Sequence, residues 1–122
     1  MYKIASDPLK NRLYITLETL ETKDVKPILS DLNKNIAALA DGFTCLVDIR
    51  SMKFDPQTKG SEYVEIIQGA LADSGMSNVV RVINKEDANY HLTMDELSIS
   101  LGYKAKPAYS LEEAENILDK TL

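Results

Sequence analysis

The sequence predicts an α/β domain built on a mixed, mostly parallel sheet of about five strands with about four helices. Strand-like segments alternate with helix-like segments along most of the chain, which is typical of βαβ units and parallel strands. The first two strand-like segments are instead separated by a short run of turn-forming residues, which predicts an antiparallel hairpin. The chain has 122 residues, the usual length of one domain, so residues 1–122 are expected to form a single unit.

The predicted strands differ in their residue patterns. Arg12–Glu18 alternates apolar and polar residues with a period of two, as expected where one sheet face is packed and the other is not. Phe43–Arg50 is nearly continuously apolar and Asn78–Asn84 is rich in β-branched residues, which favours buried parallel strands. Shorter strands are expected at Tyr2–Ala5 and near Ala105–Tyr109.

The first two predicted helices follow from the spacing of apolar residues and from end signals. Asp24–Ala40 has helical spacing, with Pro27 expected in the first turn and the Asp41-Gly42 pair as the stop. A second helix is expected within Pro56–Ser74, between two apolar strands, which completes a βαβ unit.

The last two predicted helices begin with capping boxes. Thr93 and Glu96 precede an apolar stretch that ends at Leu101, and Ser110 and Glu113 open the final helix. In such a box the hydroxyl accepts the backbone N–H three residues on, while the glutamate bonds back to the cap residue.

Strand parity predicts two unlike sheet faces. One face is expected to be uniformly apolar and covered by helices: Leu13, Ile15, Leu17, Cys45, Val47, Ile49, Val80 and Val82. The other is expected to be mixed: Tyr14, Thr16, Thr44, Leu46, Asp48, Val79, Arg81 and Ile83. A face this apolar is not expected to stay in water, so it predicts a contact surface, most simply for a second copy in a two-fold homodimer. The alternative is that the Asp24–Ala40 helix crosses over and covers it.

Composition narrows the classes of partner and compartment. Nineteen acidic and fourteen basic residues give a net charge of -5, the wrong sign for binding a phosphate backbone, so nucleic acid is not expected as a partner. Cys45 is the single cysteine and cannot form an intrachain disulfide, which predicts a reducing compartment, the cytoplasm. No apolar stretch approaches the roughly 20 residues of a membrane-spanning helix, so no transmembrane segment is expected.

The titratable residues do not predict catalysis, and neither an enzyme nor a bound metal or cofactor is expected. His91 is the single histidine, and without a second histidine or a cluster of cysteines the sequence has no zinc site of familiar spacing. Arg81 is more informative, because an unpaired charge in a buried strand is costly. It is expected either to pair with Asp48 or to contact an anionic ligand or partner carboxylate.

Three segments together resemble the STAS domain, the family of anti-sigma-factor antagonists and small stand-alone bacterial relatives allied to CRAL-TRIO lipid-binding domains. They are the stretches GFTCLVDIRSMKFDP, GMSNVVRVI and LGYKAKPAYSLEEAENIL, and the resemblance covers almost the whole chain. It implies a sheet made by successive βα turns with a hairpin strand at its edge. It also implies a non-enzymatic regulatory domain that binds a protein partner.

In the antagonists of that family, the strand similar to Phe43–Ile49 leads into a loop whose serine is phosphorylated at a helix N-terminus. The Asp-Ser-Ser-Gly motif is absent here, so the resemblance leaves the phosphoswitch in doubt. The residues that the resemblance offers for partner or ligand contact, taken with Arg81, are Asp48, Arg50, Ser51, Asp55, Thr58 and Ser61. The alternative function is a small-molecule module for a lipid or an apolar anion, using the mixed face and the adaptable side chains of Met52, Met76 and Met94.

If the protein is a phosphoswitch, Thr58 or Ser61 is the phosphate acceptor, because added negative charge is favoured near a helix N-terminus. Phosphopeptide mapping of protein from its native cells should find one of them modified. Lack of modification in all growth conditions, together with unchanged partner binding by Thr58→Asp and Ser61→Asp, would instead make them ordinary helix-start residues.

Overall fold

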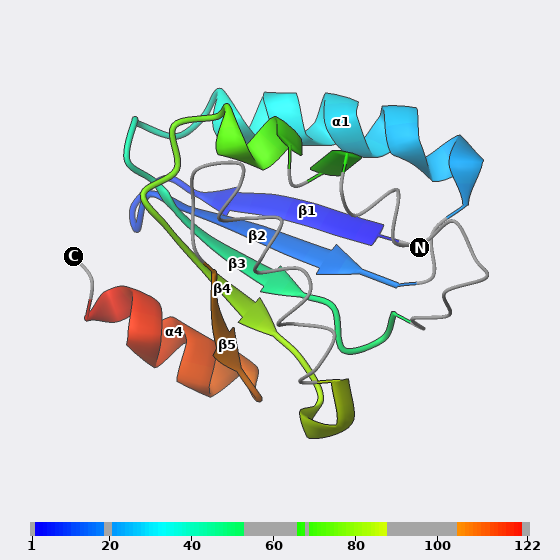
Figure 1. Ribbon diagram of the computed structural model, residues 1–122. Helices are drawn as coiled ribbons and strands as arrows, with labels where there is room; N and C mark the ends of the chain where they lie inside the picture. Colours follow the sequence, from blue (N-terminus) through cyan, green and yellow to red (C-terminus); the bar gives the residue numbers. More distant parts are fainter. Residues whose placement is uncertain (1, 19–20, 53–65, 68, 88–104, 121–122) are drawn as a thin grey trace.

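Five strands form one mixed sheet in the computed structural model, which describes residues 2–18, 21–52, 66–67, 69–87 and 105–120 (Figure 1). The strands are β1 (Tyr2–Asp7), β2 (Arg12–Leu17), β3 (Thr44–Asp48), β4 (Asn78–Val82) and β5 (Ala105–Ala108). They lie side by side in chain order, β1 antiparallel to β2 and the other neighbours parallel. This confirms the predicted mixed, mostly parallel five-stranded sheet with an N-terminal hairpin.

The hairpin turn is held by two side chains. Asp7 Oδ1 accepts the backbone N–H groups of Leu9 and Lys10 at 3.0 and 3.3 Å. Asn11 has a φ of 52°, a left-handed conformation that asparagine tolerates better than most residues. Its side chain donates to the Ala40 carbonyl at 3.2 Å and accepts the Ala40 N–H at 2.8 Å. The turn is therefore tied to the segment that leads into β3.

The first helix, α1 (Thr22–Ile36), is displaced from its predicted bounds. It begins before Asp24, whose carboxylate accepts the backbone N–H of Glu21 at 2.9 Å. Pro27 consequently lies in the second turn, where its missing N–H removes one intrahelical hydrogen bond, so the prediction of a first-turn proline is wrong. The helix also ends before Ala40, because Ala38 and Leu39 make shorter-range turn bonds to Asn35 and Ile36 in place of helical ones.

Two further helical segments are described. Residues 66–67 and 69–72 are helical, at the end of the predicted Pro56–Ser74 helix, and α4 spans Leu111–Asp119. A short 3₁₀ turn, η1 (Lys85–Asp87), follows β4. The fourth predicted helix, at Thr93–Leu101, lies outside the described residues.

Helices lie on both sides of the sheet (Figure 1). The α1 face is packed by α1 and by residues 66–67 and 69–72, with Ile28, Leu32, Ile67 and Leu71 all buried. The strand residues of the α1 face are Leu13, Ile15, Leu17, Cys45, Val47, Val79, Arg81 and Ala105. The main hydrophobic core therefore lies between this face and these helices.

The opposite side, the α4 face, carries a second and smaller apolar cluster. Ala114 and Leu118 of α4 pack against four strand residues there: Leu46, Val80, Val82 and Ala108. Helix α4 contacts β3, β4 and β5. The alternative that the Asp24–Ala40 helix crosses over to cover the mixed face is wrong, because α1 lies on the other side of the sheet.

The predicted parity of β4 is also wrong. Cys45 lies opposite Val79, and Leu46 lies opposite Val80, so Val80 and Val82 belong to the α4 face. Arg81 lies beside Val47 and joins the α1 face. Both faces of β4 are buried, so its apolar residues could not reveal which side faces α1.

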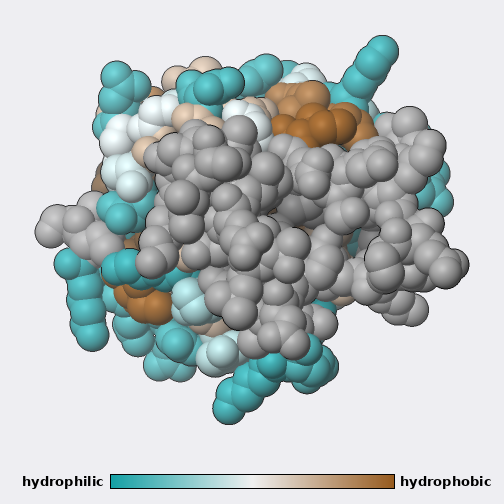
Figure 2. Space-filling model, in the orientation of Figure 1, coloured by the Kyte–Doolittle hydropathy of each residue, from teal (hydrophilic) through white to brown (hydrophobic). Residues whose placement is uncertain are grey.

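The described residues on the side shown in Figure 2 present a mainly polar surface. In Figure 2 most of the coloured atoms are hydrophilic or neutral, and the apolar areas on this side are small and separate. Four large apolar side chains are exposed among the described residues: Leu9, Ile66, Tyr109 and Leu111. None of the described helices combines the length and apolar character needed to cross a membrane.

Ser110→Ala is expected to lower the free energy of unfolding by about 1 kcal/mol. The Ser110 hydroxyl accepts the Glu113 N–H at 3.1 Å, as predicted, and the substitution leaves that N–H without its acceptor. Only half of the predicted box forms, because Glu113 Oε2 accepts the Tyr109 N–H at 3.1 Å. Urea unfolding measures the loss, with Ser110→Asp as a control that keeps an acceptor. An unchanged midpoint for Ser110→Ala would show that this cap adds nothing to stability.

Candidate functional site

Two of the predicted site residues, Asp48 and Arg50, form an ion pair at the carboxyl end of β3. Arg50 Nε and Nη2 donate to Asp48 Oδ1 and Oδ2 at 3.0 and 2.9 Å, and the Arg50 backbone N–H also donates to Oδ1 at 3.1 Å. The hydrogen bond that Arg50 donates to Asp48 is the main cause that raises the pKa of Arg50. Asn84, just beyond β4, donates to the Arg50 carbonyl at 2.8 Å. The carboxyl ends of two neighbouring strands are thus joined.

Arg81 does not lie with this pair. It is 3% exposed on the α1 face, aligned with Val47, whereas Asp48 is aligned with Val82 on the α4 face. The predicted Asp48–Arg81 arrangement on one face is therefore wrong. Ser51 is exposed next to Arg50, and the remaining predicted residues, Asp55, Thr58 and Ser61, lie outside the described residues.

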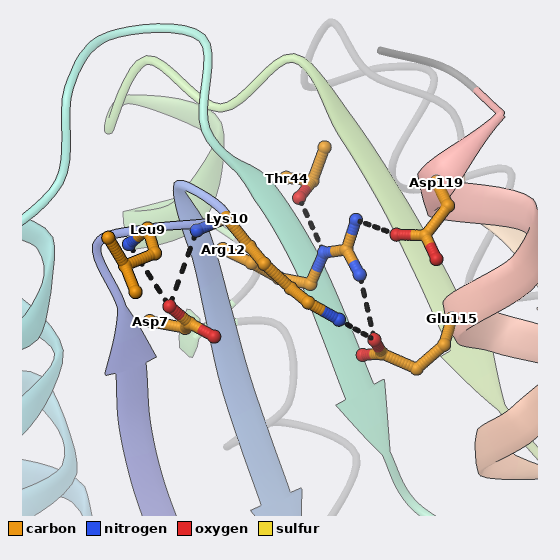
Figure 3. Close-up of polar contacts among 7 residues, drawn as sticks. All are labelled: Asp7, Leu9, Lys10, Arg12, Thr44, Glu115 and Asp119. Atoms are coloured by element: carbon orange, nitrogen blue, oxygen red, sulfur yellow. Dashed lines mark hydrogen bonds and ion pairs between the residues drawn. The ribbon is translucent and has the colours of Figure 1, made fainter.

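A buried arginine that sequence reasoning missed organises the other end of the α4 face (Figure 3). Arg12, at the start of β2, has no exposed surface. Its Nε donates to Thr44 Oγ1 of β3 at 3.0 Å, while Nη1 and Nη2 donate to Glu115 and Asp119 of α4 at 2.9 and 3.0 Å. Lys10 also donates to Glu115, at 3.1 Å. One guanidinium therefore connects two strands to the C-terminal helix.

Two patterns in the sequence could have revealed this network. Lys10 and Arg12 are two residues apart, so they can project from the same side of a strand. Glu115 and Asp119 are four residues apart on α4, each directly after a buried apolar residue, so they follow the buried stripe of the helix. Matching the two spacings would have predicted a contact between β2 and α4.

The network controls the protonation of Glu115. Burial raises the pKa of this carboxyl, but hydrogen bonding from Tyr14 and Lys10 and the charge of Arg12 outweigh burial, so its pKa is lowered. The Tyr14 hydroxyl lies close enough to lower the pKa of the carboxyl. Even so, Glu115 Oε1 is buried and has no hydrogen bond of good geometry among the described residues. The charged form of Glu115 is therefore the stable one in the folded protein.

A hollow of about 260 Å³ lies beside this network, on the part of the α4 face next to α4. Its lining combines a lysine, two hydroxyls and apolar groups: Lys3, Ala5, Tyr14, Ile15, Thr16, Leu46 and Leu111. Leu111 at its rim is 46% exposed. Thr16 is aligned with Asp48, so the Asp48–Arg50 pair adjoins the end of the hollow. We call the residues that line the hollow, together with Asp48 and Arg50, the open strip.

Reactive groups are sparse in the part of the chain that the structure describes. Burial raises the pKa of the Cys45 thiol to about 12, although the charge of Arg81 acts in the opposite direction. A thiol with this pKa is not a nucleophile at neutral pH. Among the described ranges, no group of three or more His, Cys, Asp or Glu residues is placed to hold a metal ion.

Comparisons of the chain with protein-family models, with curated proteins and with solved structures returned no match.

Glu115→Gln is expected to lower the free energy of unfolding at neutral pH by about 1 kcal/mol, because charge-assisted hydrogen bonds in a partly exposed site are lost. The folded-state pKa of Glu115 lies below its unfolded value, so its contribution is present above the unfolded pKa and is lost as pH falls through the folded pKa. The stabilities of the variant and the wild type should therefore converge in acid. Urea unfolding over a pH series measures this, with the exposed Glu112→Gln as control. A constant difference down to strongly acidic pH would contradict the assignment.

Proposed function

We propose that this protein is a non-enzymatic regulatory domain of STAS type that binds a protein partner through the open strip. The observation that carries the proposal is that, among the described residues, α4 covers only part of the α4 face. Helix α4 packs against β3, β4 and β5, and beside it a mixed surface with the half-exposed Leu111 forms a hollow over β1, β2 and β3. Exposed apolar groups with a polar surround are typical of interaction sites.

The sheet supports the STAS part of the proposal. Four parallel strands follow one another in chain order behind an antiparallel edge strand, as the resemblance implies. The Asp48–Arg50 pair occupies the carboxyl end of β3, before the loop that the resemblance assigns to partner binding. In open α/β sheets, binding surfaces lie preferentially at the carboxyl ends of strands. The single buried Cys45 is in keeping with action in the cytoplasm.

The alternative is a module that binds a lipid or an apolar anion in the hollow. Lys3 and the Tyr14 hydroxyl could face the anionic end, and Leu46 and Leu111 the apolar part. At about 260 Å³ the hollow is smaller than the roughly 300 to 1,000 Å³ of ordinary ligand pockets. Size therefore favours a protein contact. Native mass spectrometry of freshly purified protein separates the two, since a retained small molecule favours the alternative.

Photo-crosslinking in the native cells is expected to capture a protein partner from position 111 and not from position 9. The benzophenone side chain replaces Leu111 at the rim of the open strip, and in the matched control it replaces Leu9, which is 99% exposed in the hairpin turn. Arg50→Glu in the same chain should weaken the adduct, because it reverses the charge that adjoins the hollow and breaks the ion pair with Asp48. Equal capture from both positions, or an adduct that Arg50→Glu leaves intact, would contradict the proposal.

A further inference from the structure

The two edges of the sheet are built differently. At one edge, β5 has only four residues, one of them Pro107, which has no backbone N–H, beside the exposed Lys106. Proline and lysine on a short strand are common devices that stop an edge from pairing with another chain. At the other edge, β1 has six residues and no proline. Within the described residues, its backbone groups bond only to β2.

The residues of β1 are complementary to themselves in one antiparallel register. If Ala5 faces Ala5 of a second copy, Lys3 faces Asp7 at both ends and Ile4 faces Ser6. Opposite charges directly across a strand pair stabilise it. A register centred on Ile4 places Lys3 opposite Ala5 and Asp7 opposite position 1, beyond the end of β1, so neither charge faces an opposite charge. The charges on β1 therefore select the register centred on Ala5.

We propose that β1 pairs antiparallel with β1 of a second copy of this chain, about a two-fold axis at Ala5. The pairing joins two sheets into one continuous sheet of ten strands and satisfies the outward backbone groups of both edges. Helix α1 lies against β1 on the α1 face, so the two α1 helices come alongside each other and extend the contact into a second layer.

The dimer would also complete the open strip. Lys3 and Ala5 of β1 line the hollow, and in the dimer they border the same residues of the partner copy. The two hollows become one trough floored by β2 and β1 of each copy and walled by the two α4 helices. This gives a reason for α4 to contact β3, β4 and β5 and to lie away from β1. The edge pairing is independent of the proposed protein partner, which contacts the strip near Leu111.

Disulfide trapping tests the register. In the Ala5→Cys variant the two thiols face each other across directly opposed residues, whose Cα atoms are about 4.5 to 5.5 Å apart, within the range that a disulfide spans. In the Lys3→Cys control the two positions are four residues apart along the strands, about 13 Å, which is too far. Cys45 is fully buried and can stay in both variants. Mild oxidation should give a covalent dimer with Ala5→Cys alone.

Sedimentation velocity over a range of concentrations tests the charge pairs. Lys3→Glu places a glutamate opposite Asp7 at each end, so that two like charges face each other, and is expected to raise the dimer Kd about tenfold. Adding Asp7→Asn removes the repulsion and keeps an oxygen for the turn bonds to Leu9 and Lys10, so it should recover most of the affinity.

A wild-type monomer at every concentration, equal crosslinking of Ala5→Cys and Lys3→Cys, or a dimer unaffected by Lys3→Glu would overturn the proposal. None of these outcomes bears on crosslinking from position 111.

Discussion

The buried Arg12 guanidinium is the constraint around which the α4 face is arranged. A charge with no exposed surface needs partners for its donors, because an unpaired buried ion costs several kcal/mol. Thr44 on β3 and Glu115 and Asp119 on α4 provide them, all within 3.0 Å. Only Ala114 and Leu118 of α4 are fully buried, so apolar packing alone would fix this helix weakly. The polar contacts therefore decide where α4 lies along the sheet.

That placement divides the α4 face into two parts with different roles. Over β3, β4 and β5, α4 buries a small apolar cluster that is separate from the main core. Next to α4, toward the β1 edge, the side chains of Lys3, Tyr14 and Thr16 surround a hollow, and Leu111 reaches its rim from the first turn of α4. The same helix thus covers one part of the face and borders the other. The stability of the fold and the shape of the proposed binding surface therefore both depend on the contacts of Arg12 with Thr44, Glu115 and Asp119.

Local chemistry predicted the elements well. The turn formers between β1 and β2 predicted the hairpin, and the Ser110 hydroxyl predicted the start of α4, because both signals act over three or four residues. The candidate site was predicted less well. Asp48 and Arg50 do lie together, since only one residue separates them on the chain. The predicted pairing of Asp48 with Arg81 was wrong, because it required knowing which residues of β4 face α1.

The sequence by itself determined the alternation of the described strands and helices, the antiparallel start of the sheet and the Ser110 cap of α4, since each follows from backbone preferences of adjacent residues. Only the tertiary structure decided the register of β4 and the partner of Arg12. In β4 the residues Val79, Val80 and Val82 are apolar on both sides, so periodicity carries no information about which side faces which helix. Arg12 and its carboxylates are more than a hundred residues apart, and they meet because folding places the end of the chain across the beginning of the sheet.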